Sequence, residues 1–442
     1  MKLPESVLTA IKRLEDNNFE AVVVGGCVRN DCLHLPIVDY DLATNATPLE
    51  MLSVFSDYHC IETGAKHGTI TVIVDDTPLE ITTYRIDGEY KDNRHPESVS
   101  FSKQLEDDLS RRDFTINAMA YKPSQGLIDV HNGLNDLQQG IIRCVGNPYK
   151  RFDEDALRIL RGLRFAAQYG FSIEAETENA MREKKQLLLN ISPERIFQEM
   201  TKTICGPYIE TVMLQFSDIF STVCPYLKPT IGFNQNNPWH IYTAYEHIVK
   251  TVAAVKPDPI LRWTMFLHDI GKPECYSEDE NGIGHFRGHP LKSAYIAETF
   301  LKHLHIDSQS LATITTLIRA HDERIIPTEK NVKRLLNRLK GFEMVDLLLQ
   351  VQEADRAGQN PEKHNILPDP IAQIHSILKK IKDNGDCFDI QRLAINGNDC
   401  IQAGIPAGPE IGKTLSWILG KVIDGKLENN REILLNEIEK RS

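Results

Sequence analysis

The sequence AVVVGGCVRNDCLHLPIVDYDLAT, residues 21–44, sets the fold of the first part of the chain. Its apolar start predicts a buried strand, and Gly25 and Gly26 then allow a tight turn because they carry no side chain. A helix beginning near Cys27 would point its first N–H groups and Arg29 towards the turn. This arrangement suits a phosphate group, although a pair of glycines after a strand is also typical of an ordinary tight turn.

Asp39 and Asp41 follow in the extended stretch of the same sequence. Residues two apart in a strand project from one face, so both carboxylates could reach one cation. Magnesium prefers hard oxygen ligands and keeps positions open for water and phosphate. The pair therefore predicts a Mg²⁺ site; the alternative is a solvated surface pair.

A second polar stretch, RRDFTINA, covers residues 111–118. Arg111, Arg112 and Asp113 stand before an apolar run that predicts a helix beginning near Phe114. Since the guanidinium fork matches phosphate oxygens, the arginines predict an anion clamp. The alternative is a surface salt bridge.

Length and composition limit the classes of protein. The chain has 442 residues, 41% of them hydrophobic and 25% charged, and a net charge of −12. This predicts two to four domains of globular type, with nucleic-acid binding confined to local basic tracks. Nine cysteines without a CxxC pair predict reduced thiols. No apolar run is long enough for a membrane span, and the start of the chain resembles an amphipathic helix, so we expect a cytoplasmic protein without a membrane partner.

The pattern of apolar residues changes near residue 140. Short β-rich runs come before this point, and helical periodicity follows it. The stretch RFDEDALRILRGLRF, residues 151–165, predicts a single helix. A segment rich in Pro and Asn, residues 226–240, marks a further boundary before a part rich in histidine.

Four motifs together resemble a known family. GGCVR (25–29), DYD (39–41), RRDFTINA (111–118) and EDALRILRGLRF (154–165) are similar to bacterial class II tRNA nucleotidyltransferases, which include the CCA-adding enzymes and the bacterial poly(A) polymerases. One departure is Asn30, where that family usually has Asp.

The resemblance implies an α+β fold: a small mixed-sheet nucleotidyltransferase head followed by an all-helical neck, an HD domain and a helical tail. The expected boundaries are 1–142 for the head, 143–225 for the neck, 226–340 for the HD domain and 341–442 for the tail, which would bind tRNA.

The resemblance also implies template-independent addition of C, C and A to a tRNA that lacks all or part of its 3′ CCA. CTP and ATP would be the substrates. Asp39 and Asp41 would hold Mg²⁺ and act in catalysis, while Gly26, Arg29 and Arg112 would cradle the triphosphate.

Selection of the base would fall to Asp155 and Arg158. Cytosine and adenine both present an exocyclic amino donor beside a ring-nitrogen acceptor, so an acid and an arginine can recognise both. On one helix these residues would share a face, which Arg161 and Arg164 continue towards the base and the triphosphate. The alternative is a helix surface with ordinary salt bridges.

The polar segment of residues 84–96 lies where CCA-adding enzymes of this family have a flexible loop that CC-adding enzymes lack. Its presence favours complete CCA addition. Poly(A) polymerase, or an enzyme that adds only A, remains the alternative.

Eight of the fifteen histidines lie between residues 240 and 321, around the sequence HDIGKP. This part resembles an HD phosphohydrolase domain, which implies phosphatase or 2′,3′-cyclic phosphodiesterase activity. Histidine with carboxylate suits Mn, Ni, Fe or Zn better than Mg. The expected ligands are His247, His268, Asp269, His289 and His321, with Asp322 as a further option. The alternative is a set of core or capping histidines.

A basic helix is predicted over residues 329–342, with the basic residues Lys330, Lys333, Arg334, Arg338 and Lys340. Lys333, Arg334 and Arg338 would contact RNA phosphates, and a merely solvated helix is the alternative. Two rival functions are an HD-type nucleotide phosphohydrolase or signalling protein and a non-enzymatic RNA-binding module.

Overall fold

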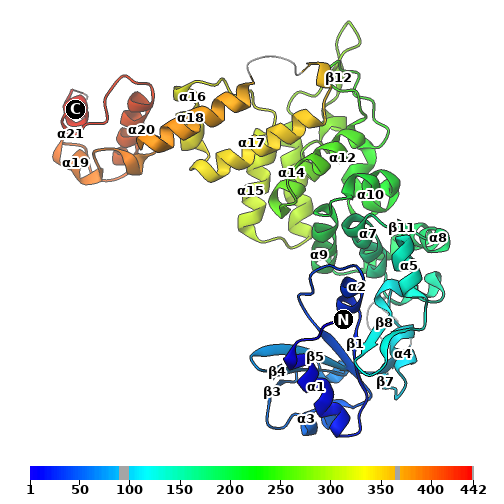
Figure 1. Cartoon of the computed structure of the whole chain (residues 1–442). Helices are drawn as coiled ribbons and strands as arrows, with labels where there is room; N and C mark the ends of the chain where they lie inside the picture. Colours follow the sequence, from blue (N-terminus) through cyan, green and yellow to red (C-terminus); the bar gives the residue numbers. More distant parts are fainter. Residues whose placement is uncertain (89–98, 364–368, 441–442) are drawn as a thin grey trace. The chain divides into compact units, whose positions relative to one another are not determined.

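The computed structural model describes residues 1–88, 99–363 and 369–440, and it divides into two compact units. The first unit consists of Met1–Lys228 and His303–Ile306, and the second consists of Pro229–Lys302 and Asp307–Ser442. Figure 1 gives the element labels along the chain. None of the helices in the described ranges is both long and apolar enough to cross a membrane.

The first unit contains a seven-stranded mixed sheet. In spatial order its strands are β3 (His59–Ile61), β4 (Thr69–Val74), β5 (Thr77–Thr83), β2 (Asp41–Thr44), β1 (Ala21–Val24), β8 (Met119–Lys122) and β9 (Gly126–Asp129). Only β2 and β5 run parallel, and the other neighbours are antiparallel. This confirms the predicted mixed-sheet head.

Strand β1 is central, so all four of its residues are buried. Val23 pairs with Leu42 on one side and with Tyr121 on the other. Strand β4 alternates, with Ile70, Val72 and Val74 buried. Helices α1 (Glu5–Asp16) and α3 (Pro48–Val54) pack against the sheet, and α2 (Gly26–Cys32) follows β1 directly (Figure 1).

The remaining elements of the first unit are mostly helical. The two short strand pairs are β6 (Arg85–Asp87) with β7 (Val99–Phe101) and β10 (Ile141–Ile142) with β11 (Ser172–Ile173). The further helices are α4 (Leu105–Ser110), α5 (Gly133–Gln139), α6 (Pro148–Glu154), α7 (Leu157–Tyr169), α8 (Ala175–Lys184), α9 (Pro193–Ile204), α10 (Ile209–Gln215) and α11 (Ser217–Val223).

Two predictions about this unit are wrong. The stretch 151–165 is not one helix, because α6 ends at Glu154 and α7 begins at Leu157. The apolar run after Phe114 is not an α-helix either. It forms a short 3₁₀ turn and then strand β8, because pairing with β1 and β9 satisfies its backbone groups in the sheet.

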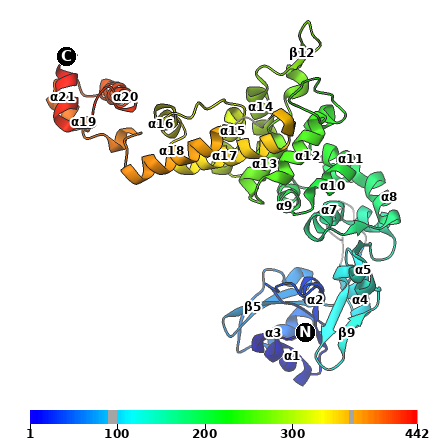
Figure 2. The same cartoon turned by 45° about the horizontal axis from the view of Figure 1, so that its top comes forward.

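The second unit is helical apart from a small hairpin of β12 (Ser277–Glu278) and β13 (Gly284–His285). Its helices are α12 (Ala244–Ala254), α13 (Pro259–Leu267), α14 (His289–His303), α15 (Ser308–Ala320), α16 (Glu329–Arg338), α17 (Phe342–Ala357), α18 (Pro370–Asn384), α19 (Gly397–Gln402), α20 (Pro409–Ile423) and α21 (Arg431–Glu439). Helix α17 packs against α12, α13 and α15, and α18 runs beside α17 (Figure 2). The last three helices enclose a small core of their own.

Candidate functional site

The first unit contains a cavity of about 680 Å³ that is rich in positive charge. Eight arginines and three aspartates line it: Arg29, Arg85, Arg111, Arg112, Arg158, Arg161, Arg164, Arg195, Asp41, Asp113 and Asp155. Such an excess of guanidinium groups suits a polyanion such as a triphosphate. The turn after β1, the stretch after α4 and the start of α7 bring these residues together.

Eight of the nine residues predicted for the head and neck line this one cavity: Gly26, Arg29, Asp41, Arg112, Asp155, Arg158, Arg161 and Arg164. The ninth, Asp39, is exposed in the segment before β2 and is not among the lining residues. Strand β2 begins at Asp41, so the two aspartates are not both within a strand as predicted.

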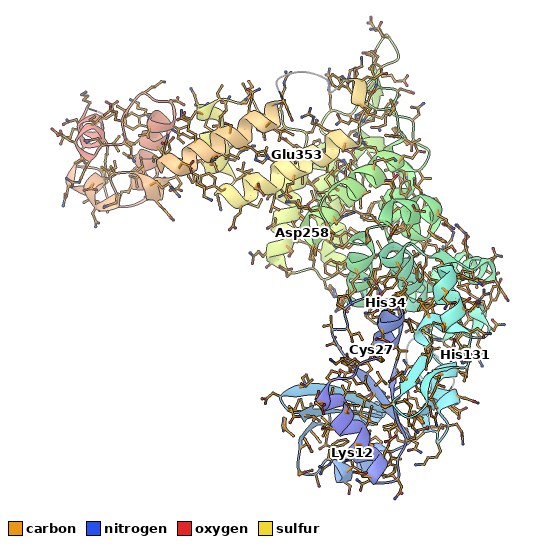
Figure 3. All side chains as sticks on the ribbon, in the orientation of Figure 1. Lys12, Cys27, His34, His131, Asp258 and Glu353 are labelled. Carbon is orange, nitrogen blue, oxygen red and sulfur yellow. The ribbon has the colours of Figure 1, made fainter. Side chains whose placement is uncertain are left out.

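The turn after β1 requires glycine at Gly25. Its φ is +78°, and a Cβ atom there would lie 2.9 Å from Nη1 of Arg112. The turn leads into α2, whose first residues include the buried Cys27, labelled in Figure 3. The backbone at this point can therefore approach a guanidinium or a ligand closely.

Arg29 is held rigidly at the wall of the cavity. It is 8% exposed, it donates to Oδ1 of Asn117, and its Nη2 donates to Oδ1 of Asn30 at 2.9 Å. Its guanidinium lies over the rings of Phe165 and Tyr169 at 5.2 and 5.1 Å. Burial lowers its pKa. Asn30, the departure from the family pattern, thus orients Arg29.

Asp41 lies in an electrostatically strained position. Although Asp41 is exposed at the start of β2, desolvation by the surrounding protein raises its pKa, and the negative charges of Glu80 and Asp39 add to this, while Arg112 opposes it. Asp41 also pairs with Glu80 across β2 and β5, and neighbouring carboxylates of this kind favour a bound cation.

Asp108, which the sequence analysis missed, fixes both arginines of the RRD motif. It is completely buried, and Oδ1 accepts from Nε of Arg111 at 3.0 Å while Oδ2 accepts from Nη2 of Arg112 at 2.9 Å. Burial alone would raise its pKa, but the two arginines outweigh burial and the pKa is lowered. The spacing of three and four residues before the arginines could have indicated this role.

Asp113 fixes Arg161 in the same way. Nε of Arg161 donates to Oδ2 of Asp113 at 2.8 Å, and Nδ2 of Asn117 donates to Oδ1 at 3.0 Å. Despite burial, Arg161 and these hydrogen bonds hold the pKa of Asp113 well below its usual range. Asp113 and Asn117 were in the quoted motif but had no predicted role.

Asp155 lies at the bend between α6 and α7. Its backbone is extended, with φ −139° and ψ 101°, and its Oδ1 accepts from the N–H of Leu157 at 3.1 Å, as in a helix cap. Its Oδ2 forms an ion pair with Arg195 at 3.1 Å. This cap explains the break in the predicted helix, and Arg195 is a cavity residue that the sequence analysis missed.

Arg158 is anchored separately. It forms an ion pair with Glu154 at 2.8 Å and donates to the carbonyl oxygens of Arg151 and Arg111 at 3.1 and 3.0 Å. Further along α7, Arg164 pairs with Glu199 at 3.0 Å. Each arginine of α7 therefore has an acidic partner that fixes its direction.

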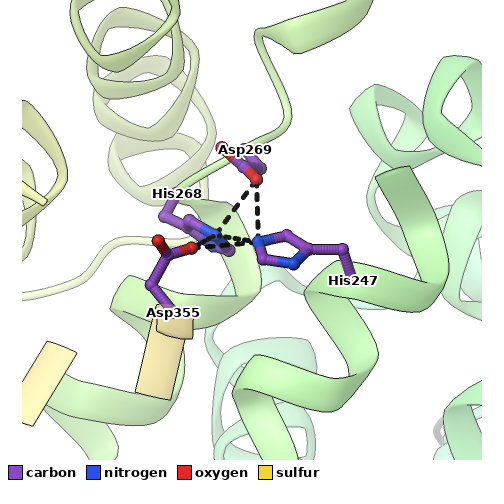
Figure 4. A group of neighbouring side chains, drawn as sticks. All are labelled: His247, His268, Asp269 and Asp355. Carbon is purple, nitrogen blue, oxygen red and sulfur yellow. Dashed lines mark hydrogen bonds and ion pairs between the residues drawn. The ribbon is translucent and has the colours of Figure 1, made fainter. Parts of the chain in front are cut away.

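The second unit contains a buried cluster of histidines and aspartates (Figure 4). Nε2 of His247 lies 3.2 Å from Nε2 of His268, 3.1 Å from Asp269 and 3.0 Å from Asp355. A second group shares Asp269, which lies 3.2 Å from His289 and 3.6 Å from His321. The four predicted histidines thus all contact the fifth predicted ligand, Asp269, and we call the two groups together the Asp269 cluster.

Asp355 was not predicted; it comes from α17, more than 80 residues after Asp269 in the sequence. Asp322, the optional ligand, is exposed and belongs to neither group. The sequence EADR, residues 353–356, does not resemble a metal-binding motif. Asp355 reaches the histidines only because α17 packs against α12 and α13 in the folded unit.

The four histidines of the Asp269 cluster share one orientation. Each Nδ1 donates to a backbone carbonyl, of Gly358, Met265, Phe286 and Ile318, at 2.7 to 2.8 Å. In a neutral imidazole this leaves Nε2 as an acceptor. The Nε2 atoms face one another at 3.2 Å in the pairs His247–His268 and His289–His321, where neither neutral partner can donate. A cation between them would satisfy both.

Charges around the cluster agree with this reading. The carboxylates outweigh the burial of His268 and raise its pKa to about 9, and the pKa of Asp269 is well below its usual range because His268 and Lys272 outweigh burial. Nζ of Lys272 lies 2.7 Å from Asp269. Positive charge is therefore favoured here, as protons or as a bound ion.

The basic residues of α16 pair with acids within the second unit. Lys330 and Arg334 both contact Asp424, at 3.1 and 2.8 Å, Arg338 contacts Glu323, and Lys333 lies between Glu329 and Asp386. Their binding to RNA stays a prediction.

The loop predicted over residues 84–96 lies outside the described residues from residue 89 onwards.

The fold and the arginine-lined cavity are those of a nucleotidyltransferase. Family descriptions match three parts of the chain: "Poly A polymerase head domain" at 21–143, "Probable RNA and SrmB- binding site of polymerase A" at 170–230 and tRNA nucleotidyltransferase domain 2 at 291–438.

Relatives match along the whole length. The CCA-adding enzyme of Geobacillus thermodenitrificans is 33% identical over 98% of this chain and 96% of its own, and that of Limosilactobacillus fermentum is 32% identical over 96% and 94%. The solved CCA-adding enzyme of Bacillus stearothermophilus in complex with CTP is 27% identical, with a TM-score of 0.72 over 100% of this chain and 98% of that one. This chain therefore belongs to the family of CCA-adding enzymes.

Proposed function

We propose that this nucleotidyltransferase adds C, C and A to the 3′ end of tRNA from CTP and ATP, in the cytoplasm. The observation that carries the proposal is the single cavity that holds Asp41, Asp155 and eight arginines. The relatives named CCA-adding enzymes and the likeness to a structure in complex with CTP support it.

Asp39 and Asp41 would hold Mg²⁺, and Gly26, Arg29 and Arg112 would cradle the triphosphate. The raised pKa of Asp41, beside Asp39 and Glu80, fits a site that takes up a divalent cation. When bound, this ion supplies activation of the RNA 3′-hydroxyl and stabilisation of the pyrophosphate leaving group. Asp108 and Asp113 hold Arg112 and Arg161 in fixed positions, so these arginines would bind the nucleotide without a change of side-chain conformation.

Asp155 and Arg158 would read the base. A carboxylate oxygen can accept from the exocyclic amino group shared by C and A, and a guanidinium N–H can donate to the ring nitrogen. Arg161 and Arg164 would position the base and the triphosphate from the same helix. Glu154, Asp113 and Glu199 hold the three arginines in place.

A gel assay tests the product. On tRNA that lacks its last three nucleotides, with Mg²⁺, CTP and ATP, we expect extension by three nucleotides and then a stop. Asp41→Ala should abolish incorporation with the fold intact, whereas the control Glu106→Gln, at an exposed residue of α4, should not. A long ladder of A would favour a poly(A) polymerase. A failure to incorporate labelled CTP would favour a rival HD-type signalling protein or a passive RNA-binding module.

A second function is carried by a different observation. Because four Nε2 atoms converge on Asp269, we propose a metal-dependent phosphohydrolase in the second unit, with phosphatase or 2′,3′-cyclic phosphodiesterase activity. His247, His268, Asp269 and Asp355 would hold a Mn, Ni, Fe or Zn ion, and His289 and His321 extend the site. When bound, the ion supplies an activated water.

Hydrolysis of a 2′,3′-cyclic nucleotide with Mn²⁺ or Ni²⁺ tests this second function. We expect turnover that His268→Ala removes while CCA addition continues. If none of these ions supports turnover, the phosphohydrolase proposal is wrong.

A further inference from the structure

Asn30 departs from the family pattern and lies beside Arg29, which lines the arginine-rich cavity of the first unit. Its Oδ1 accepts from Nε and Nη2 of Arg29 at 3.2 and 2.9 Å, and its Nδ2 donates to the carbonyl oxygen of Pro36 at 3.2 Å. A carboxylate in this place could accept from the arginine, but it could not donate to a carbonyl. The amide therefore makes a pair of contacts that the aspartate usual in the family cannot make.

Arg29 differs from other arginines of the cavity in the charge of its partners. Arg112 and Arg161 each form an ion pair with an aspartate. Across the part of the chain that the structure describes, Arg29 forms no ion pair, and its hydrogen bonds go to the amide oxygens of Asn30 and Asn117. An amide oxygen orients a guanidinium without cancelling its charge, so Arg29 keeps its full attraction for a phosphate.

The second contact of Asn30 is with the segment that connects α2 to β2. Helix α2 ends in a Schellman motif, in which the N–H of Leu35 donates to the carbonyl oxygen of Asn30 at 2.9 Å. His34, labelled in Figure 3, has the left-handed φ of +55° that this motif requires. Because Pro36 follows directly, the backbone and the side chain of Asn30 hold two consecutive residues of the segment.

Residues 36–39 lead from this point towards Asp41, the first residue of β2. Within the described ranges, the bond from Asn30 to Pro36 is the only hydrogen bond that fixes residues 36–39. Asp39 is exposed, so packing contributes little to its position. The position of Asp39 therefore depends on Asn30.

We propose that Asn30 positions both the anion-binding and the metal-binding part of the nucleotidyltransferase site. It directs Arg29 at the triphosphate with the charge of the guanidinium intact, and it holds the segment that carries Asp39 in place for Mg²⁺. The inference rests on the CCA addition proposed above and adds a positioning residue to it. Asn30 is not among the residues that line the cavity, so it acts through Arg29 and Asp39.

Asn30→Asp tests the charge of Arg29. The carboxylate can still accept from Arg29, but it neutralises the guanidinium, so CTP binding in equilibrium dialysis without metal should weaken roughly tenfold. Asn30→Ala leaves Arg29 charged and bound to Asn117, so it should weaken binding less. Unchanged CTP binding by Asn30→Asp, or equal weakening by the two variants, would overturn the proposal.

The matched control is Asn135→Asp, at an exposed residue of α5. It adds the same negative charge to the first unit, but Asn135 does not line the cavity. We expect it to bind CTP as tightly as the unaltered protein. Weakening equal to that of Asn30→Asp would show that net charge is the cause and would contradict the proposal.

Asn30→Ala tests the hold on the segment. Thermolysin cleaves before large apolar residues, and Val38 is 85% exposed. Cleavage between Ile37 and Val38 requires the segment to move away from the surface, so it should be roughly fivefold faster in Asn30→Ala. The Mg²⁺ concentration that gives half-maximal incorporation of CTP should rise as well. If both quantities equal those of the unaltered protein, the proposal is wrong.

A merely structural role of Asn30 leads to a different result. A general loss of stability would disturb the whole unit, including the choice of nucleotide by Asp155, whereas a positioning role leaves the preference for CTP and ATP over UTP and GTP unchanged. Altered selectivity in Asn30→Ala would therefore contradict the proposal. An unaltered protein that incorporates no CTP would overturn the proposed CCA addition as well, while variants that equal an active unaltered protein would overturn only the role of Asn30.

Discussion

Asp155 combines a structural and a proposed recognition role in one side chain. One oxygen caps α7 at the N–H of Leu157, and the other pairs with Arg195 at the wall of the cavity. An alanine substitution would therefore remove the cap as well as the proposed base contact, and the loss of a cap alone costs about 1 kcal/mol. A sharper test keeps the cap.

We expect Asp155→Asn to keep the fold and lose base selection. The asparagine oxygen can still cap α7, but its NH₂ group donates where the carboxylate accepts, so UTP and GTP gain relative to CTP and ATP. Single-turnover incorporation of the four nucleotides measures this. Unchanged selectivity would contradict the base-reading role.

Asp108 offers a test of preorganisation. Asp108→Asn should lower the free energy of unfolding by about 3 kcal/mol at neutral pH, because two arginines lose a buried carboxylate. It should also weaken CTP binding. Denaturant unfolding and CTP titration measure the two effects, with Glu106→Gln on the same helix as the control.

The same variant has a defined pH dependence. Because the folded-state pKa of Asp108 is lowered, its stabilisation is present above the unfolded value near 3.8 and is lost as pH falls through the folded value. The difference between the unaltered protein and Asp108→Asn should therefore shrink when the pH is lowered from about 5 to about 3. A constant difference would show that the carboxylate charge is not the cause.

At the scale of elements, α7 is placed by a close contact with the turn after α9. A Cβ atom on Gly206 would lie 2.5 Å from the backbone oxygen of Ala167, and the N–H of Tyr208 donates to this oxygen at 2.9 Å. The backbone at Gly206 and the backbone at Ala167 cannot easily move apart to make room for a side chain. The direction of the arginines on α7 therefore depends on a glycine outside the cavity.

Gly206→Ala should destabilise the first unit by about 1–3 kcal/mol, as overpacking does. The control is Gly420→Ala in α20, where a Cβ atom meets nothing within 4 Å and alanine should add up to about 1 kcal/mol. Thermal unfolding of both variants checks this. Equal stability of the two would refute the close contact.

Helix ends also build the Asp269 cluster. His268 and His321 directly follow the last residues of α13 and α15 as their C-caps, and each turns its Nδ1 back to a carbonyl of the preceding helix, three residues earlier. The last carbonyls of a helix have no partner within it, so they are available to such side chains. Sequence spacing located the histidines, but it did not indicate this orientation.

At the scale of the whole molecule, the two proposed activities lie in separate units. Removal of a transition metal by a chelator should lower one unfolding transition by roughly 5–10 °C, since an ion at a hundred times its Kd adds about 2.7 kcal/mol. Once Mg²⁺ is restored, CCA addition should be unchanged. Calorimetry with and without chelator measures the shift.

The variant His321→Gln serves as the control for this experiment, because it removes one ligand of the Asp269 cluster and should reduce the shift. A transition that does not respond to the chelator in the unaltered protein would contradict the metal site.

The division into head, neck, HD domain and tail stays a prediction. The Asp269 cluster includes Asp355, which lies beyond the expected HD boundary at residue 340.

The sequence by itself determined the β-rich first part of the chain, the turn at Gly25 and Gly26, the arginine motif and the histidines of the second unit, while the mixed-sheet head followed from the family resemblance. These features are local, because periodicity, glycine turns and motif spacing act over a few residues.

Only the tertiary structure decided the rest. It placed Asp155 at a bend, made a strand of the run after Phe114, and brought Asp108, Arg195 and Asp355 to their sites. The physical reason is that a buried charge or an unpaired backbone group must find a partner, and that partner is often distant in sequence. Which partner it finds depends on packing across the whole unit, and spacing along the chain does not record it.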